Sequence, residues 1–219
     1  MTQEAGFIIG DLQVERMIQA LSSHSGATTQ KQLSPGKLIV FTGPSGVGKG
    51  TLMRSLLQRH PELYYSVSAT TRSPRAGELD GKDYYFISRQ KFEQLIAQGE
   101  FLEWAEFAGN YYGTPKQSVL NKINIGKSVV LEIEVEGAKQ IRKAFPDMLS
   151  VFILPPSIEE LEKRLRSRAQ DSDTAIARRL MRSQEEIQVA HEFDLQIVND
   201  DFDTTLHDIE SALFQSSDS

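Results

Sequence analysis

The sequence contains no cysteine, so it can form no disulfide bond, no thiolate metal site and no cysteine nucleophile. Its four histidines are scattered without the spacing of a metal site. No apolar run approaches the ~18 residues that a membrane-spanning helix needs. A basic start followed by a long apolar segment is also missing, and Glu4, Asp11 and Glu15 stand where a transit peptide avoids acids. We therefore expect a cytoplasmic protein with no membrane partner.

Basic residues are scarce relative to acidic ones. Lys and Arg number 24 against 30 Asp and Glu, which gives a formal net charge of −6. Nonspecific nucleic-acid binding needs a basic surface, so we expect no nucleic-acid partner. A small anionic ligand held by a local basic cluster is compatible with this charge. The 219 residues can bury a sizeable core and suit one domain with mobile insertions.

Residues 1–35 differ from the rest of the chain. They combine a short apolar-periodic piece with the polar stretch SSHSGATTQKQ. We expect a flexible N-terminal extension with one or two helical turns; a regulatory or oligomerisation arm is the alternative. Whether the protein is a monomer or a homodimer stays open.

Short apolar runs alternate with helical patterns from residue 37 onward. The runs predict strands at 37–43, 83–88, 128–135, 149–156 and 194–200. Helical spacing predicts helices from Thr51 onward and at 90–99, 136–145, 157–169, 174–190 and the C-terminus. This alternation predicts an α/β fold, a parallel sheet with helices on both faces. Within 128–135, a period of two would put the carboxylates of Glu132 and Glu134 on one face.

The stretch GPSGVGK, residues 43–49, fits the phosphate-loop pattern G-x-x-x-x-G-K. Its glycines let successive N–H groups point at a phosphate, the following helix adds its positive dipole end, and Lys49 adds a mobile charge. Gly50 stands where Ser or Thr normally ligates Mg²⁺, and Thr51 comes one place later. Either Mg²⁺ is held by phosphates, water and a remote carboxylate, or the loop is only a turn. The strand before it and the helix after it favour nucleotide binding, and GKGT suits a kinase of small acceptors.

A second group of residues has the chemistry of another anion site. Arg72 and Arg75 stand three apart around Pro74, with Tyr84 downstream, and two guanidinium groups can grip a phosphate. Two solvated loop arginines are the alternative. The stretch FLEWAEFAGNYYGTP, 101–115, adds Glu103, Tyr112 and Thr114 to the polar groups nearby.

Seven stretches together resemble the guanylate kinase family, from Gly36 to Leu213. They are the loop, SVSATTRSPRAGE, GKDYYF, FLEWAEFAGNYYGT, GKSVVLEIEVEGA, RLRSRAQDS and VNDDFD. The resemblance implies a doubly wound parallel sheet core of the P-loop type, with a small α/β GMP-binding insertion and a helical lid. It implies a core of 36–66, 118–158 and 189–214, a GMP-binding domain of 67–117 and a lid region of 159–188. The implied reaction is Mg²⁺-dependent transfer of the γ-phosphoryl group of ATP to GMP or dGMP, with domain closure.

The resemblance also assigns roles to residues. ATP would be bound by Gly43, Pro44, Ser45, Gly46, Val47, Gly48, Lys49, Gly50, Thr51 and Asn199. GMP would be bound through its phosphate by Arg72, Arg75, Tyr84 and Tyr112, through its base by Ser68, Glu103 and Thr114, and near the metal by Glu132 and Glu134. Catalysis would rest on Lys49, Arg72, Arg164, Arg168 and Arg179. Thr51 and Glu134 are possible metal ligands beside the phosphates and water.

The chemistry of guanine fits Glu103. An ionised carboxylate accepts from the N–H groups at N1 and N2, and the Thr114 hydroxyl can donate to O6. Adenine has a bare acceptor at N1 that would face the carboxylate, so the site should reject AMP. Phosphoryl transfer needs aligned, neutralised phosphates rather than a nucleophilic side chain. Of the other arginines between 164 and 182, we expect Arg166 and Arg182 to be solvated and leave Arg178 open.

The sequence departs from the family at several positions. The family commonly has Asp at Glu132 and Glu134, often Gln at Glu136, and a lid glycine at Ala169. The longer carboxylates leave open which of the first two acts near the metal. Two alternatives to the kinase therefore stand: a catalytically inactive guanylate-kinase-like module that binds proteins, and a kinase for another small phosphate acceptor such as AMP, dTMP or a ribose bisphosphate.

Overall fold

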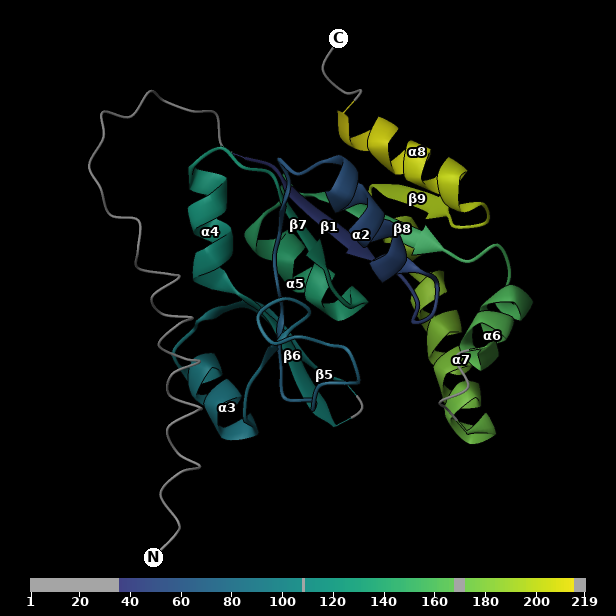
Figure 1. Cartoon of the computed structure of the whole chain (residues 1–219), viewed down its shortest axis with the longest axis horizontal. Helices are drawn as coiled ribbons and strands as arrows, with labels where there is room; N and C mark the ends of the chain where they lie inside the picture. The colour runs from purple at the N-terminus through teal and green to yellow at the C-terminus, as the bar shows by residue number, and fades with distance from the viewer. Residues whose placement is uncertain (1–35, 108, 168–171, 215–219) are drawn as a thin grey trace, which may run out of the picture. The chain divides into compact units, whose positions relative to one another are not determined.

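The computed structural model describes residues 36–107, 109–167 and 172–214. The predicted extension 1–35, and Arg168 and Ala169 of the predicted lid, lie outside these ranges. Two compact units make up the described chain (Figure 1). The smaller unit is Val67–Gly126, and the larger unit combines Gly36–Ser66 with the described residues from Lys127 onward.

The larger unit is built on a five-stranded sheet with the order β2-β7-β1-β8-β9, in which every neighbouring pair is parallel. Its strands are β1 (Leu38–Thr42), β2 (Tyr64–Tyr65), β7 (Val129–Glu132), β8 (Leu149–Leu154) and β9 (Leu195–Val198). Its helices are α2 (Lys49–Arg59), α5 (Val135–Ala144), α6 (Ile158–Ser167), α7 (Asp173–Gln188) and α8 (Phe202–Phe214), with a short 3₁₀ turn at Ala190–Glu192. The predicted parallel α/β sheet is confirmed.

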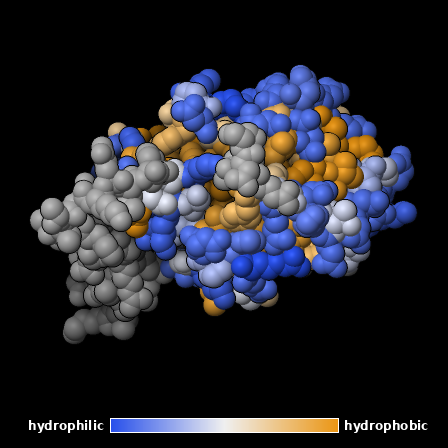
Figure 2. All heavy atoms as spheres, turned by 90° about the horizontal axis from the view of Figure 1, so that it is seen from above, coloured by the Kyte–Doolittle hydropathy of each residue, from blue (hydrophilic) through white to orange (hydrophobic). Residues whose placement is uncertain are grey.

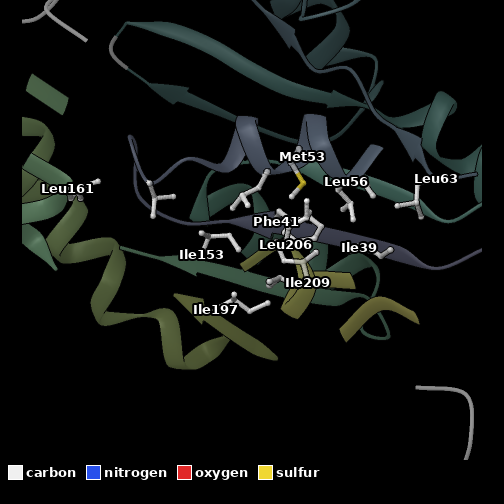
Figure 3. Packing of buried hydrophobic residues seen from close by; sticks show 14 of the residues in the cluster. Ile39, Phe41, Met53, Leu56, Leu63, Ile153, Leu161, Ile197, Leu206 and Ile209 are labelled. Carbon is white, nitrogen blue, oxygen red and sulfur yellow. The ribbon is translucent and has the colours of Figure 1, made fainter. Parts of the chain in front are cut away.

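Helices cover both faces of this sheet, in keeping with its largely apolar strands (Figure 1). On β1, Ile39 and Phe41 pack in one cluster with residues of α2 and α8, among them Leu56 and Leu206 (Figure 3). Val40, between them in sequence, points to the other face and is fully buried there. Helix α5 packs against β1 on that side. Such a two-sided core holds the carboxyl end of β1, and therefore the loop after it, in a fixed place.

The strand predicted over 128–135 is shorter in the structure. Strand β7 ends at Glu132, and Val135 is already the first residue of α5. The alternation predicted across 128–135 fails because the buried residues Val135, Ala138 and Ile141 have the three-residue spacing of a helix. Glu134 is therefore the N-cap of α5 and does not continue the strand face of Glu132.

The smaller unit is a four-stranded sheet with the order β4-β3-β6-β5. Its elements are β3 (Ala69–Thr70), β4 (Tyr85–Phe86), α3 (Arg89–Ala97), β5 (Phe101–Phe107), β6 (Asn110–Pro115) and α4 (Lys116–Asn124). Strands β5 and β6 form an antiparallel hairpin, and α3 packs on β6 through the fully buried Phe92, whose ring stacks on Phe101 and Tyr111. The hairpin pairs Glu103 with Thr114.

Hydrophilic residues cover much of the face drawn in Figure 2, and orange apolar residues lie between them. Exposed large apolar side chains include Trp104 on β5, Met181 on α7 and Val198 on β9.

Within the described ranges, no helix has the length and apolarity to cross a bilayer.

Candidate functional site

The loop between β1 and α2 has the backbone that the glycine pattern predicts. Gly43, Gly46 and Gly48 all have positive φ, at 138°, 93° and 106°. A side chain at Gly48 would also be blocked, because its Cβ would lie 2.6 Å from the amide nitrogen of Asn199. Helix α2 begins at the next residue, so its free N–H groups and positive dipole end face the loop. This is the geometry of an anion site at a helix N-terminus.

Lys49 lies across this loop. Its Nζ donates to the carbonyl oxygen of Gly43 and, at 3.2 Å, to that of Pro44. An ammonium group held by backbone carbonyls can transfer its hydrogen bonds to phosphate oxygens. The structure therefore keeps the predicted phosphate-binding lysine at the mouth of the loop.

Two residues brace the far side of the loop. Asn199, only 7% exposed, donates from its amide nitrogen to the carbonyl of Val47 at 2.7 Å. Arg164 on α6 donates to the same carbonyl at 3.3 Å and to the carbonyl of Asn199 at 3.0 Å. Both side chains therefore hold loop backbone in this structure, which ties the position of α6 to the shape of the loop.

Helix α7 supplies a further contact to the loop. The guanidinium of Arg179 donates to the Ser45 hydroxyl at 2.6 Å. Arg164 and Arg179, assigned to catalysis from the sequence, thus reach the loop from two different helices, whereas Arg168 lies outside the described residues. Arg166 is exposed and paired with Glu162 and Asp173, in line with the expected solvated position.

Side-chain oxygen atoms that could ligate a metal ion lie beside the first turn of α2. A Cβ at Gly50 would be 3.8 Å from both carboxylate oxygens of Glu132, so this carboxylate faces the place that a Ser or Thr side chain would occupy. Tyr65 donates its hydroxyl to Glu132 at 3.3 Å. Burial raises the pKa of Glu132, while the positive charge of Lys49 opposes this rise. Thr51 is exposed and accepts from Arg54 at 3.4 Å.

The described residues contain no group of three or more His, Cys, Asp or Glu side chains able to hold a metal ion unaided. Glu132, Glu134 and Thr51 nevertheless offer carboxylate and hydroxyl oxygens, the donors that Mg²⁺ prefers. Such a partial set fits an ion that keeps water and phosphate among its ligands.

Arg182 meets the expectation of a solvated position only in part, because 40% of its side chain is exposed. It is half-buried, its Nε donates to Glu186 at 2.8 Å, and its other end lies 3.7 Å from Glu134. Glu186 itself is only 8% exposed. Burial raises the pKa of Glu186, and the hydrogen bond from Arg182 opposes this rise. The four-residue spacing of Arg182 and Glu186 on one helix was visible in the sequence, but the burial of Glu186 was not.

The smaller unit brings together the residues predicted to bind the acceptor phosphate. The Arg72 guanidinium lies 5.4 Å from the centre of the Tyr84 ring, and the Tyr84 and Tyr112 rings are 6.0 Å apart, edge to face. A hydrogen bond with Tyr112 is among the influences that raise the pKa of Arg72, although its pairing with Glu78 has the largest effect. One guanidinium and two phenols therefore meet in one place.

Glu78 is an unpredicted member of this group. Both terminal nitrogens of Arg72 donate to its two carboxylate oxygens, at 2.9 and 2.8 Å, and the backbone N–H of Arg75 donates at 2.7 Å. The pairing with Arg72 lowers the pKa of Glu78. The sequence signal was a lone carboxylate in the motif RAGE, which does not reveal its partner. The Arg75 side chain is exposed and keeps its guanidinium outside this pair.

Glu103 and Thr114 form a buried polar pair across the hairpin. They are 5% and 0% exposed, and the Thr114 hydroxyl donates to the Glu103 carboxylate at 2.6 Å. Buried polar groups are costly unless paired, so this bond holds the carboxylate in place. Ser68 precedes β3 and is half-buried. It contributes its carbonyl to the Tyr85 N–H.

Comparison with known proteins gives consistent matches. A family model described as guanylate kinase matches residues 35–216. A guanylate kinase from Trichormus variabilis is 72% identical over 198 residues, which cover 90% of this chain and 100% of that protein. A guanylate kinase from Synechococcus elongatus is 56% identical over 182 residues, 83% of this chain and 100% of that protein. The crystal structure of a guanylate kinase from Anaplasma phagocytophilum superposes with a TM-score of 0.72 at 34% identity, covering 85% of this chain and 89% of that one.

Proposed function

This chain belongs to the guanylate kinase family, and from that premise we propose which of its residues carry out the transfer of the γ-phosphoryl group of ATP to GMP. The reaction makes ADP and GDP. The observation that carries the proposal is the presence of two anion sites of different construction, one in each unit, in a chain 72% identical to a guanylate kinase over most of its length.

ATP binds at the loop of the larger unit. The backbone N–H groups from Gly43 to Thr51 cradle its phosphates, and Lys49 moves its hydrogen bonds from loop carbonyls to the outer phosphate oxygens. Arg164 and Arg179, which touch the loop at Val47 and Ser45, add positive charge around the group in transfer. Asn199 keeps the loop in shape and lies on the side of the adenine.

The GMP phosphate binds in the smaller unit. Arg72 is held by Glu78, and its guanidinium, with the hydroxyls of Tyr84 and Tyr112, binds the phosphate oxygens. The exposed Arg75 closes over the same phosphate. These contacts fix the attacking oxygen, which is the main demand of the reaction.

The guanine binds at the buried pair of Glu103 and Thr114, with Ser68 beside it. The Glu103 carboxylate accepts from the N–H groups at guanine N1 and N2. The Thr114 proton goes to Glu103 in this structure, so donation to guanine O6 requires the hydroxyl to rotate when the base arrives. AMP would bring its N1 acceptor against the Glu103 carboxylate instead of a donor, which can cost ~10⁴-fold in discrimination.

Glu132, Glu134 or Thr51 would lie near a Mg²⁺ ion carried by ATP, with phosphate and water as most of its ligands. When bound, the ion would offset the negative charge of the ATP phosphates. An oxygen of the GMP phosphate forms its bond to the γ-phosphorus while the bond from that phosphorus to the β–γ bridging oxygen breaks. The two units close during this step, since water must be kept from the phosphoryl group.

The proposed contacts of the acceptor are to its base and phosphate rather than its ribose, so dGMP serves as well. The reaction takes place in the cytoplasm, and the chain acts as a monomer or a homodimer.

An acceptor panel tests the proposal. ADP release is measured with ATP and Mg²⁺ against GMP, dGMP, AMP and dTMP, with Lys49→Ala as the folded, inactive control. We expect turnover with GMP and dGMP and a kcat/KM for AMP lower by ~10⁴-fold. Faster turnover of AMP would refute the role of Glu103, and no turnover with any acceptor would favour a protein-binding module.

A further inference from the structure

Helix α7 directs one row of side chains toward the loop. Residues three and four apart lie on the same helix face, so Arg179, Arg182, Ser183 and Glu186 share one side. Arg179 contacts the loop at Ser45, and Ser183 and Glu186 are 1% and 8% exposed. This row is therefore an inner face of the larger unit.

Glu186 anchors Arg182 within this row. A buried carboxylate is stable only with a partner, and the Nε of Arg182 donates to it at 2.8 Å. One edge of the guanidinium is thereby fixed to α7 itself. The Nη2 of the same guanidinium lies 3.7 Å from Oε2 of Glu134.

Glu134 makes this contact from a position where glutamate is not a preferred residue. It is the N-cap residue of α5, where Asp, Asn, Ser and Thr are preferred because their short side chains bond the free N–H groups of the helix. Its carboxylate makes no such capping bond. The side chain instead reaches across to Arg182 on another helix.

We propose that Arg182 is a positioning residue for the kinase reaction, which fixes the carboxylate of Glu134 while Glu186 fixes Arg182. The inference rests on the function proposed above, because Glu134 matters only if it acts near the acceptor or the ion. Arg182 also lies between the carboxylates of Glu134 and Glu186, and its positive charge offsets the repulsion between them.

The extra methylene of Glu134 is part of this arrangement. Glu134→Asp would draw the carboxylate back from Arg182 and toward the N–H groups of α5, where a shorter side chain forms the cap. Once the carboxylate is held by the cap, it no longer depends on Arg182. The two positions are therefore expected to be coupled.

The test is a double-mutant cycle of Arg182→Ala and Glu134→Asp, with Arg178→Ala as the matched control on the exposed side of α7. Arg182→Ala should lower kcat/KM for GMP about five- to tenfold in the wild-type background and less than twofold in the Glu134→Asp background. Arg178→Ala should stay within twofold of wild type. Equal losses from Arg182→Ala in both backgrounds would overturn the proposal.

Urea unfolding of the same four proteins separates positioning from stability. A purely structural ion pair would show coupling in the free energy of unfolding and leave kcat/KM per folded enzyme unchanged, which would also overturn the proposal. Coupling in kcat/KM with little coupling in unfolding supports it. A wild-type protein without turnover in the acceptor panel would instead refute the proposed function, whatever the unfolding data give.

Discussion

At the scale of single residues, Arg72, which we propose to bind the acceptor phosphate, is already paired with a carboxylate of the protein, Glu78. Glu78 occupies both of its terminal nitrogens and also accepts from the N–H of Arg75. The carboxylate thus holds the Arg72 side chain and the Arg75 backbone in place before any ligand is bound. A side chain prepared in this way loses less freedom when it binds its ligand.

Glu78→Gln should therefore weaken acceptor capture. The amide keeps one hydrogen bond and loses the ion pair, so we expect KM for GMP to rise about three- to tenfold with kcat within twofold. Steady-state kinetics measure both, and Glu93→Gln, which removes an exposed pair with Arg89, is the control. A fall in KM would mean that Glu78 competes with the phosphate and does not prepare its site.

The Glu78 carboxylate should also affect how the free energy of unfolding depends on pH in the acid range. Pairing with Arg72 lowers the pKa of folded Glu78 below the ordinary value of about 4.3. Between these two pKa values the unfolded chain binds more protons than the folded chain. The stabilising contribution of Glu78 to the free energy of unfolding is therefore fully present above about pH 4.3. It is lost as the pH falls through the folded pKa. Urea unfolding from about pH 5.5 to 3 should show a shallower loss for Glu78→Gln than for wild type. Parallel curves would contradict the ion pair.

Residue types could be assigned from the sequence better than residue partners. Arg72, Tyr84 and Tyr112 were predicted to act together, and they meet in the structure. The partners Glu78 and Arg182 were not predicted. A carboxylate six residues from an arginine, or an arginine on a helix, has the same sequence pattern whether it is solvated or buried, and only the packing decides.

At the scale of elements, Asp194 joins the starts of two strands. It accepts from the backbone N–H of Ser150 at 2.8 Å, from the Ser150 hydroxyl at 2.7 Å and from Arg142 at 2.9 Å. Ser150 lies at the start of β8 and is fully buried, and Asp194 directly precedes β9. These contacts of Asp194 lie at the amino ends of β8 and β9, whereas the loop 43–49 follows the carboxyl end of β1.

Asp194→Ala should destabilise the protein without harming the site. It leaves the N–H and hydroxyl of Ser150 buried without an acceptor, at a cost of about 2–4 kcal/mol in the free energy of unfolding. Urea unfolding measures this loss, with the exposed Asp208→Ala as control, and kcat/KM per folded enzyme should stay within twofold of wild type. A large kinetic effect with unchanged stability would contradict this separation.

Helices and strands with a strong apolar pattern in the sequence could be predicted, and those with a weak apolar pattern could not. The strands of the parallel sheet are nearly continuous apolar runs, so β1 and β8 were identified from sequence. The hairpin of β5 and β6 was not, because its polar residues Glu103 and Thr114 point inward and break the usual alternation. Helix α4 buries only Val119 completely, which leaves little apolar signal.

At the scale of the whole molecule, the two-unit organisation predicts motion during the reaction. Because the chain has no cysteine, Gln98→Cys and Asp208→Cys, both exposed and one in each unit, allow two labels to be attached specifically. We expect the distance distribution between the labels to shift when GMP and a non-hydrolysable ATP analogue are both bound. Double electron–electron resonance measures it. An identical distribution with and without both nucleotides would contradict closure.

The smaller unit is also the link between two neighbouring strands of the larger one. The chain leaves β2 after Tyr65 and returns at Val129 to form β7, which pairs with β2 in parallel. A tight turn joins only antiparallel strands, and a parallel pair needs a crossover of roughly a dozen residues or more. Excising residues 67–126 would thus demand a substitute bridge to keep β2 at the sheet edge. The base and phosphate contacts that we propose for the acceptor lie in this segment. We therefore expect that the corresponding segment of a relative could be grafted between these junctions while the pairing of β2 with β7 is kept.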